Sequence, residues 1–266
     1  MRRLAPVLSL LLVVACGGGG ETADAQDDAI VGGTRDARAS AAGYLVHAAS
    51  ADGLAGAKVA CGATLIAPNV AVTAAHCVYA AAHDVWAFGA GDLGAGKLTR
   101  VASQHIHPEF HPAPAGTFDV HYYLRNNDVA YLLLERDVTG VVPATLPDAA
   151  PAMGCGYAAS GYHDGQHVRA KACLGLEVTL GDDPIFEVHP ADSSALCVRD
   201  GDDGSPLVSD GTGGVVLVGF YVGSVTQGLT DCVKGTQFLD GYESAFGFRA
   251  FCREGIALGA ANRVQH

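Results

Sequence analysis

Short segments in which apolar residues alternate with polar or small ones recur along most of the chain, with Gly, Pro, Asn and Asp between them. A period of two residues indicates a half-buried β-strand, and the intervening residue types are those that turns prefer. The segments predicted as strands are YLVHA, ATLIA, VAVTAA, VAYLLL, LEVTL and VVLVGFYV, at residues 44–48, 63–67, 70–75, 129–134, 176–180 and 215–222. The pattern therefore predicts an all-β protein.

Helical spacing is expected at only two places. One is a short turn after His76, in CVYAAAH, and the other is a C-terminal helix from about residue 244 to 260. In the second, apolar side chains recur every three or four residues behind a possible cap, Ser244; they are Phe248, Phe251, Cys252 and Ile256. A proline-rich stretch, VVPATLPDAAPAMG, divides the strands into halves at about 30–140 and 150–243. Many short strands followed by one helix fit two packed antiparallel barrels.

The N-terminus has the pattern of an export signal. Two arginines precede the apolar run Leu4 to Ala15, which is too short to span a bilayer. Residues 1–15 are therefore predicted as a signal peptide, and VVAC, ending at Cys16, resembles the lipobox at which bacterial lipoproteins are lipidated. Residues 16–29 then form a Gly-rich, acidic tether or propeptide. The alternative is an ordinary signal peptide that is cut later, near Ala25.

Charge and cysteines narrow the class of protein further. The formal net charge of −12, without a basic run, argues against a nucleic-acid partner. Export implies an oxidising compartment, so the seven cysteines after Cys16 are expected to form disulfides, with at least one left over because seven is odd. No Cys-x-x-Cys spacing suggests zinc, and no metal or cofactor is expected.

Four local motifs follow one another along the chain. They are IVGG from Ile30, CGATLIAPNVAVTAAHC at 61–77, NNDVAYLLLERDV at 126–138 and GDDGSPLV at 201–208. In this order they resemble the trypsin-like (chymotrypsin-fold) serine protease family, over about residues 30–256. The resemblance implies two six-stranded Greek-key β-barrels with a C-terminal α-helix.

By that resemblance His76 is the general base, and Asp128 accepts the hydrogen bond that fixes its tautomer. The nucleophile is missing, because the family pattern Gly-Asp-Ser-Gly-Gly-Pro is replaced by Gly-Asp-Asp-Gly-Ser-Pro, with Asp203 in the place of the serine. A carboxylate has no hydroxyl proton to give and repels a developing oxyanion. Ser205 is an alternative nucleophile, but it lies two residues further on, past a glycine turn.

The resemblance also assigns roles around the triad. It places the oxyanion-hole amides at Gly201 and Asp203, and it pairs Asp202 with an Ile30 amine freed by cleavage after Ala29. An imidazole between Asp128 and Asp203 should have a raised pKa. We expect the three side chains to form an ion pair in preference to a cation-binding site. The segment that carries four further histidines resembles an ordinary loop of the family, and this interpretation is preferred to a metal cluster. These histidines are His105, His107, His111 and His121.

Two features near the expected substrate pocket depart from the family pattern. The family's Ser-Trp-Gly strand should fall near 222–224, where the chain has Val-Gly-Ser, and Cys197 stands two residues too far from Gly201. The resemblance implies disulfides Cys61–Cys77 and Cys197–Cys232. For the other cysteines, Cys155 could pair with Cys173 on an adjacent strand or with the terminal helix.

These observations predict an exported, monomeric homologue of the trypsin-like proteases that is catalytically inactive and acts by binding a protein or peptide. The rival hypothesis is an active serine endopeptidase with unusual site chemistry. The expected location is extracytoplasmic, as an outer-membrane lipoprotein of a bacterium or as a secreted protein, with a lipid anchor at Cys16 as the sole membrane contact.

Overall fold

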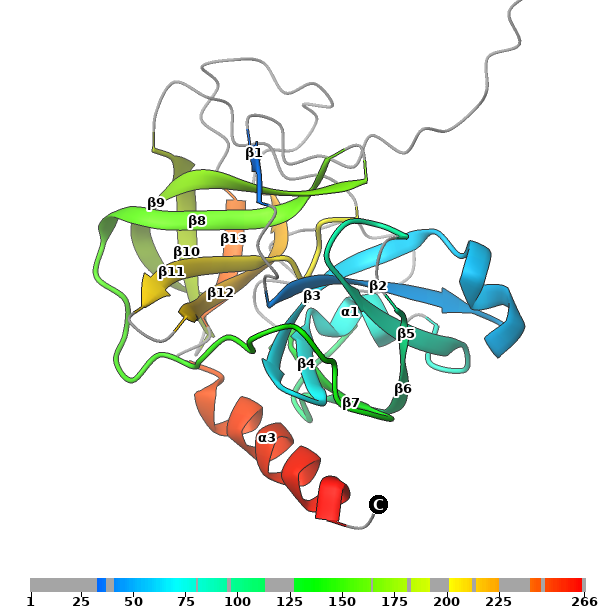
Figure 1. Ribbon diagram of the computed structural model, residues 1–266. Coiled ribbons are helices and arrows are strands. Elements are labelled where there is room, and N and C mark those ends of the chain that lie inside the picture. The colour runs from blue at the N-terminus through cyan, green and yellow to red at the C-terminus, as the bar shows by residue number, and fades with distance from the viewer. Residues whose placement is uncertain are drawn as a thin grey trace, which may run out of the picture.

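A computed structural model describes residues 33–36, 41–79, 81–94, 97–112, 127–163, 165–180, 183–191, 201–211, 214–224, 240–244 and 247–264. Six strands close the first barrel in the order β2-β3-β4-β7-β6-β5. Their bounds are β2 Ala42–Ala48, β3 Val59–Ala67, β4 Val70–Thr73, β5 Val85–Ala90, β6 Thr99–Ile106 and β7 Ala130–Leu134. Between them lie the 3₁₀ helix η1, Ala51–Gly56, and the short helix α1, Ala75–Tyr79 (Figure 1).

The second half of the chain forms a ring of six antiparallel strands, because β8 pairs with both β9 and β11. These strands are β8 Gly154–His163, β9 Gln166–Leu180, β10 Asp183–Pro190, β11 Pro206–Gly211, β12 Gly214–Ser224 and β13 Asp240–Ser244. A two-residue strand, β1 (Thr34–Arg35), adds to the edge of β9. All six predicted strand segments overlap strands of the structure, and the predicted fold class is confirmed.

The crossover between the halves contacts both of them. The amide of Ala144 donates to the carbonyl oxygen of Leu65 in β3, and Thr145 exchanges backbone hydrogen bonds with Val215 and Leu217 of β12. Apolar packing continues this junction, since the main core cluster joins residues of β3, β4 and β7 to Leu217 and Phe220 of β12. The two halves therefore share a continuous interior.

Helix α3, Arg249–Val264, lies against β7 at the lower end of Figure 1. It begins five residues later than predicted, because Ser244 belongs to β13. The Ser244 side chain still caps the turn that leads into α3, where its Oγ accepts from the Gly247 amide and its carbonyl oxygen accepts from the Phe248 amide. Phe248 and Cys252 are buried at the helical spacing expected for them. Among the described helices, none is long and apolar enough to cross a membrane.

Candidate active site

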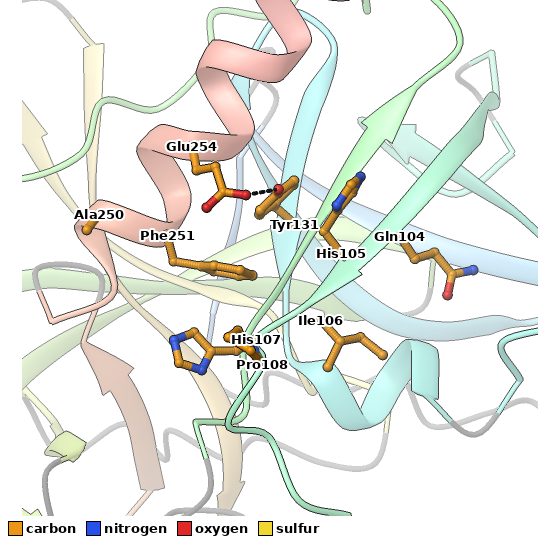
Figure 2. A pocket seen from close by; sticks show the side chains of 9 residues that line it. All are labelled: Gln104, His105, Ile106, His107, Pro108, Tyr131, Ala250, Phe251 and Glu254. Carbon is orange, nitrogen blue, oxygen red and sulfur yellow. Dashed lines mark hydrogen bonds between the residues drawn. The ribbon is translucent and has the colours of Figure 1, made fainter.

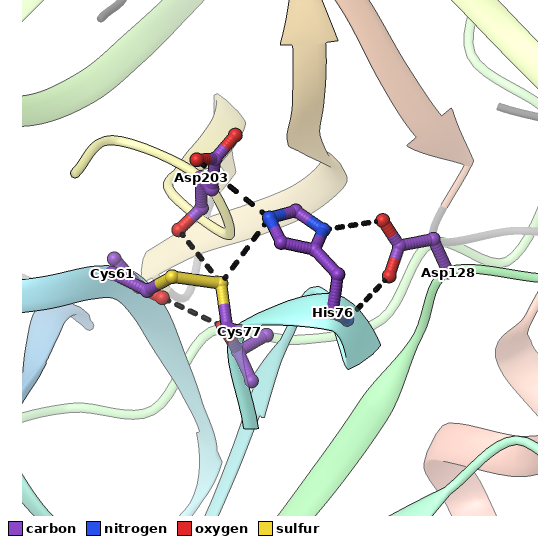
Figure 3. The surroundings of a disulfide bond; sticks show 7 residues. Cys61, His76, Cys77, Asp128 and Asp203 are labelled. Carbon is purple, nitrogen blue, oxygen red and sulfur yellow. Dashed lines mark hydrogen bonds and ion pairs between the residues drawn. A yellow bond between two sulfur atoms is a disulfide. The ribbon is translucent and has the colours of Figure 1, made fainter. Parts of the chain in front are cut away.

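His76 and Asp128 are brought together by the pairing of β4 with β7. These strands are antiparallel with Thr73 opposite Ala130, so a residue just after β4 lies beside a residue just before β7. Asp128 is fully buried, and its two carboxylate oxygens accept from the His76 backbone amide at 2.8 Å and contact the ring Nδ1 at 2.6 Å. The carboxylate thus fixes both the backbone and the ring of His76, which leaves Nε2 facing Asp203 (Figure 3).

A disulfide restrains the chain next to His76. Cys61 in β3 is joined to Cys77, the residue after His76, as the resemblance implied. Because α1 has only five residues and little intrinsic stability, this link to β3 restrains the segment that carries the imidazole.

The GDDGSP segment brings Asp203 opposite the free side of the ring. The Asp203 carboxylate Oδ2 lies 3.6 Å from His76 Nε2, and its side chain is about one quarter exposed, at 24%. In Figure 3 the imidazole lies between the two carboxylates, Asp128 on Nδ1 and Asp203 on Nε2. At 3.6 Å the second contact is an ion pair longer than an ordinary hydrogen bond, so Asp128 is the stronger partner.

This arrangement sets the protonation of the imidazole. Burial by itself would lower the pKa of His76, but the charge and hydrogen bond of Asp128, followed by those of Asp203, raise that pKa from 6.5 to about 11. The ring is therefore an imidazolium at neutral pH. A protonated histidine cannot take a proton from a nucleophile.

Backbone hydrogen bonds from both barrels fix the position of Asp203. Its carbonyl oxygen accepts from the Gly62 amide of β3 at 2.7 Å, and the next amide, of Gly204, donates to the Tyr221 carbonyl of β12 at 2.7 Å. Gly204 has φ +81°, and a Cβ there would lie 2.4 Å from the Gly62 carbonyl oxygen. Only glycine fits this close crossing of two chain segments.

Ser205 does not serve as a substitute nucleophile in this geometry. It is 2% exposed, and its hydroxyl has no hydrogen-bond partner in the described part of the chain, His76 included. The hydroxyl packs against Gly62, where an added Cβ would lie 2.0 Å from Ser205 Oγ. A nucleophile needs access to a substrate and contact with a base, and this hydroxyl has neither.

Of the remaining residues assigned by the resemblance, Asp202 is buried at 4% exposure and Gly201 has φ +99°. The partner expected for Asp202, Ile30, lies outside the described residues, as do Cys16, Cys197 and Cys232. Val-Gly-Ser at 222–224 ends β12, where Gly223 and Ser224 pair with Gly241 and Asp240 of β13.

Two other questions left by the sequence are resolved. Cys155 is joined to Cys173, its direct neighbour across β8 and β9, so a bond from Cys155 to the terminal helix is wrong. Cys252 of α3 is unpaired among the described residues, and burial raises the pKa of its thiol to about 12, which keeps it protonated and unreactive.

The described residues do not assemble a metal site around His76. The nearest group of three donor residues is Cys61, His76 and Cys77, but both sulfurs belong to the disulfide. Asp128 and Asp203 contact opposite nitrogens of the ring, and a single cation cannot bind both carboxylates together with His76 in that arrangement. The ion pair is the better description.

Gly62 and Tyr221 are site residues that the sequence did not reveal. Gly62 follows Cys61 within a recognised motif, but its role depends on its contact with residues about 140 positions further along the chain. Tyr221 contacts Gly204 and Ser205 through its backbone, and a side-chain pattern gives no signal for such contacts.

The sequence is similar to those of known proteins of one family. A family model described as Trypsin matches residues 30–242. Kallikrein 1-related peptidase-like b4 from Mus musculus is 28% identical over 223 residues, covering 75% of this chain and 83% of that protein. Kallikrein 1-related peptidase b27 from Mus musculus is 27% identical over 183 residues, covering 58% of this chain and 67% of that protein.

Proposed function

Because the chain belongs to the trypsin family, we propose that it is an exported, catalytically inactive homologue that acts by binding a protein or peptide. The observation that carries this proposal is the Asp203 carboxylate, 3.6 Å from His76 Nε2, where peptide-bond hydrolysis through an acyl intermediate needs a hydroxyl group.

Three chemical defects follow from that carboxylate. It offers no proton to the imidazole and is a weak nucleophile, and loss of the triad serine in such enzymes lowers turnover by about 10⁶-fold. Together with Asp128, which contributes more, it raises the pKa of His76 to about 11, so at neutral pH the ring already carries the proton that a general base would have to accept. Its negative charge would further repel the oxyanion of a tetrahedral intermediate.

A binding role is supported by what remains around the defect. Asp128 still orients His76, Cys61–Cys77 still restrains it, and the loop of Asp203 is still held by both barrels. A site whose groups are kept in this order can hold a peptide segment without cutting it. In this proposal the protein works as a monomer without a cofactor, and its signal sequence directs it out of the cytoplasm.

The rival function is an active serine endopeptidase. The two mouse relatives are named as peptidases, and the His76–Asp128 pair has the geometry such an enzyme uses. The rival needs a hydroxyl at the imidazole, and Ser205 would have to leave its buried position against Gly62 to supply it.

A fluorophosphonate probe, which labels only activated serines, separates the two functions. We expect no labelling of the parent protein at pH 7–9. We expect Asp203→Ser to become labelled at the introduced hydroxyl, because the substitution supplies the nucleophile and removes one of the carboxylates that keep His76 protonated.

Matched variants make the result specific. Asp203→Ala removes the same charge without adding a hydroxyl and should stay unlabelled, and His76→Ala in the Asp203→Ser background should abolish labelling. Labelling of the parent at Ser205 would overturn the proposal and establish the endopeptidase. Recovery of the parent's binding partner from culture by Asp203→Ala would show that the carboxylate is dispensable for binding.

A further inference from the structure

A pocket of about 630 Å³ lies between β6 and the first turns of α3, and it contains none of the triad positions. Figure 2 shows its walls, with Phe251 and Glu254 projecting from α3 toward Tyr131 and His105 of the barrel. The lining residues are Gln104, His105, Ile106, His107, Pro108, Tyr131, Ala250, Phe251 and Glu254.

Four of the nine lining residues carry aromatic rings, and these rings contact one another. His105 stacks on Tyr131 with ring centroids 4.6 Å apart and planes 12° apart, and Phe251 packs on the same tyrosine at 4.8 Å. His107 meets Phe251 edge to face at 4.9 Å. These contacts fix the rings against one another, so the pocket is largely preformed.

One carboxylate is placed at this aromatic wall. The Tyr131 hydroxyl donates to Glu254 Oε1 at 2.9 Å, and the helix can approach the tyrosine because residue 255 is glycine. A Cβ at Gly255 would lie 2.7 Å from Tyr131 Cγ. Burial, together with Glu254, raises the pKa of Tyr131, so its hydroxyl remains the donor. Glu254 is itself exposed, so a ligand can reach its carboxylate.

The charge of the pocket favours a cation. None of the nine lining residues that the structure describes is a lysine or an arginine. Burial outweighs the nearby Glu254 and lowers the pKa of His105 below 6.5, so that ring is neutral at pH 7. The basic side chains of the same part of α3, Arg249 and Arg253, are directed to Asp148 outside the pocket.

We propose that this pocket binds a primary alkylammonium group, with the ammonium on Glu254 and the alkyl chain along the partly exposed rings of His105, His107 and Phe251. A carboxylate and aromatic faces together stabilise an organic cation, and the N–H donors of a primary amine suit the remaining lone pairs of Glu254. The same chemistry occurs in a free amine and in a lysine side chain of a protein. The site goes beyond the proposed function, because it does not depend on whether the triad is active.

The test is an NMR titration of the full-length protein with n-butylamine hydrochloride at fixed pH and ionic strength. We expect saturable shifts of the His105 and His107 ring signals. n-Butanol, which has the same chain without the charge, should produce no saturable shift. Glu254→Gln, which retains an acceptor for the Tyr131 hydroxyl, should weaken butylamine binding at least fivefold. Asp52→Asn, at an exposed acidic position in η1, should bind as the parent does.

The peptide acetyl-Gly-Lys-Gly-amide distinguishes the two sources of the amine. Tighter binding of this peptide than of butylamine supports a lysine of a protein as the ligand, and weaker binding supports a free amine. The proposal is overturned if butylamine gives no saturable shift, if butanol matches it, or if Glu254→Gln binds equally well. None of these outcomes depends on the fluorophosphonate experiment, so each hypothesis can fail alone.

Discussion

At the scale of single residues, two neighbouring aspartates of identical chemistry have different surroundings. Asp202 is buried at 4% exposure, whereas the Asp203 side chain is 24% exposed and faces the imidazole. Gly201 and Gly204, which flank the pair, both have positive φ. Residue type alone therefore does not assign a role in this loop.

The first prediction at this scale concerns the protonation of His76. The folded-state pKa is raised from 6.5 to about 11, so the ion pair stabilises the fold fully below pH 6.5 and loses that contribution as pH rises toward 11. The ring ¹⁵N signals of His76 should therefore show an imidazolium throughout pH 5–9. His105, with a lowered pKa, should titrate below 6.5 in the same spectra.

Asp203→Asn is the matched variant for this titration. It retains the size of the side chain and removes its charge, so the pKa of His76 should fall while Asp128 still holds it above 6.5. A His76 signal that titrates near 6.5 in the parent protein would show that the two carboxylates do not act as an ion pair with the ring.

Some of this site could be predicted from the sequence, and some could not. His76, Asp128 and Asp203 stand in motifs whose order implies that they meet. The burial of Ser205 was not readable, because it follows from a Gly62 backbone that has no Cβ and belongs to another barrel. Contacts between backbones distant in sequence leave little trace in residue patterns.

At the scale of elements, alternation of apolar residues located the strands but not their lengths. LEVTL is only the last third of β9, whose 15 residues pair first with β8 and then with β10. A strand that serves two partners in succession has no single pattern of inward and outward positions. The predicted start of α3, at about residue 244, was wrong because Ser244 both ends β13 and caps the following turn.

Gly255→Ala tests how α3 is seated on the barrel. The added Cβ would lie 2.7 Å from Tyr131 Cγ and 2.8 Å from its Cδ2. Overpacking of this kind costs about 1–3 kcal/mol, which should exceed the roughly 1 kcal/mol that alanine gains over glycine within a helix. We expect a lower melting temperature by circular dichroism and a changed environment of the Tyr131 ring.

Asn262→Ala is the control for helix propensity, because Asn262 is an exposed residue of the same helix. That variant should be as stable as the parent or slightly more stable. If Gly255→Ala were also neutral or stabilising, α3 would not rest on Tyr131 as closely as the structure has it.

At the scale of the whole molecule, a compact two-barrel body follows a leader whose sequence suggests export and lipid attachment. The formal net charge of −12 is compatible with the proposed export. Residues 16–29 would then act as a tether, and a cut after Ala29 would free both the body and the Ile30 amine.

Cys16→Ala tests the anchor in bacterial cells. The parent should sediment with membranes and be released by detergent rather than by high salt, because acyl chains hold it through apolar burial. The variant should be found in the soluble extracytoplasmic fraction. A parent protein that is soluble, with an N-terminus near Ala25, would instead support the ordinary signal peptide.

The hydrogen bond from the Gly62 amide to the Asp203 carbonyl joins a strand of the first barrel to a loop of the second. The arrangement of His76, Asp128 and Asp203 consequently exists only after both halves of the chain have folded and docked. Neither half alone presents the imidazolium between its two carboxylates, so a ligand selective for that surface would distinguish the native protein from a chain in which only one half is folded. The surface formed by His76, Asp128 and Asp203 is therefore a conformational epitope, because its residues are distant in sequence and meet only in the folded chain.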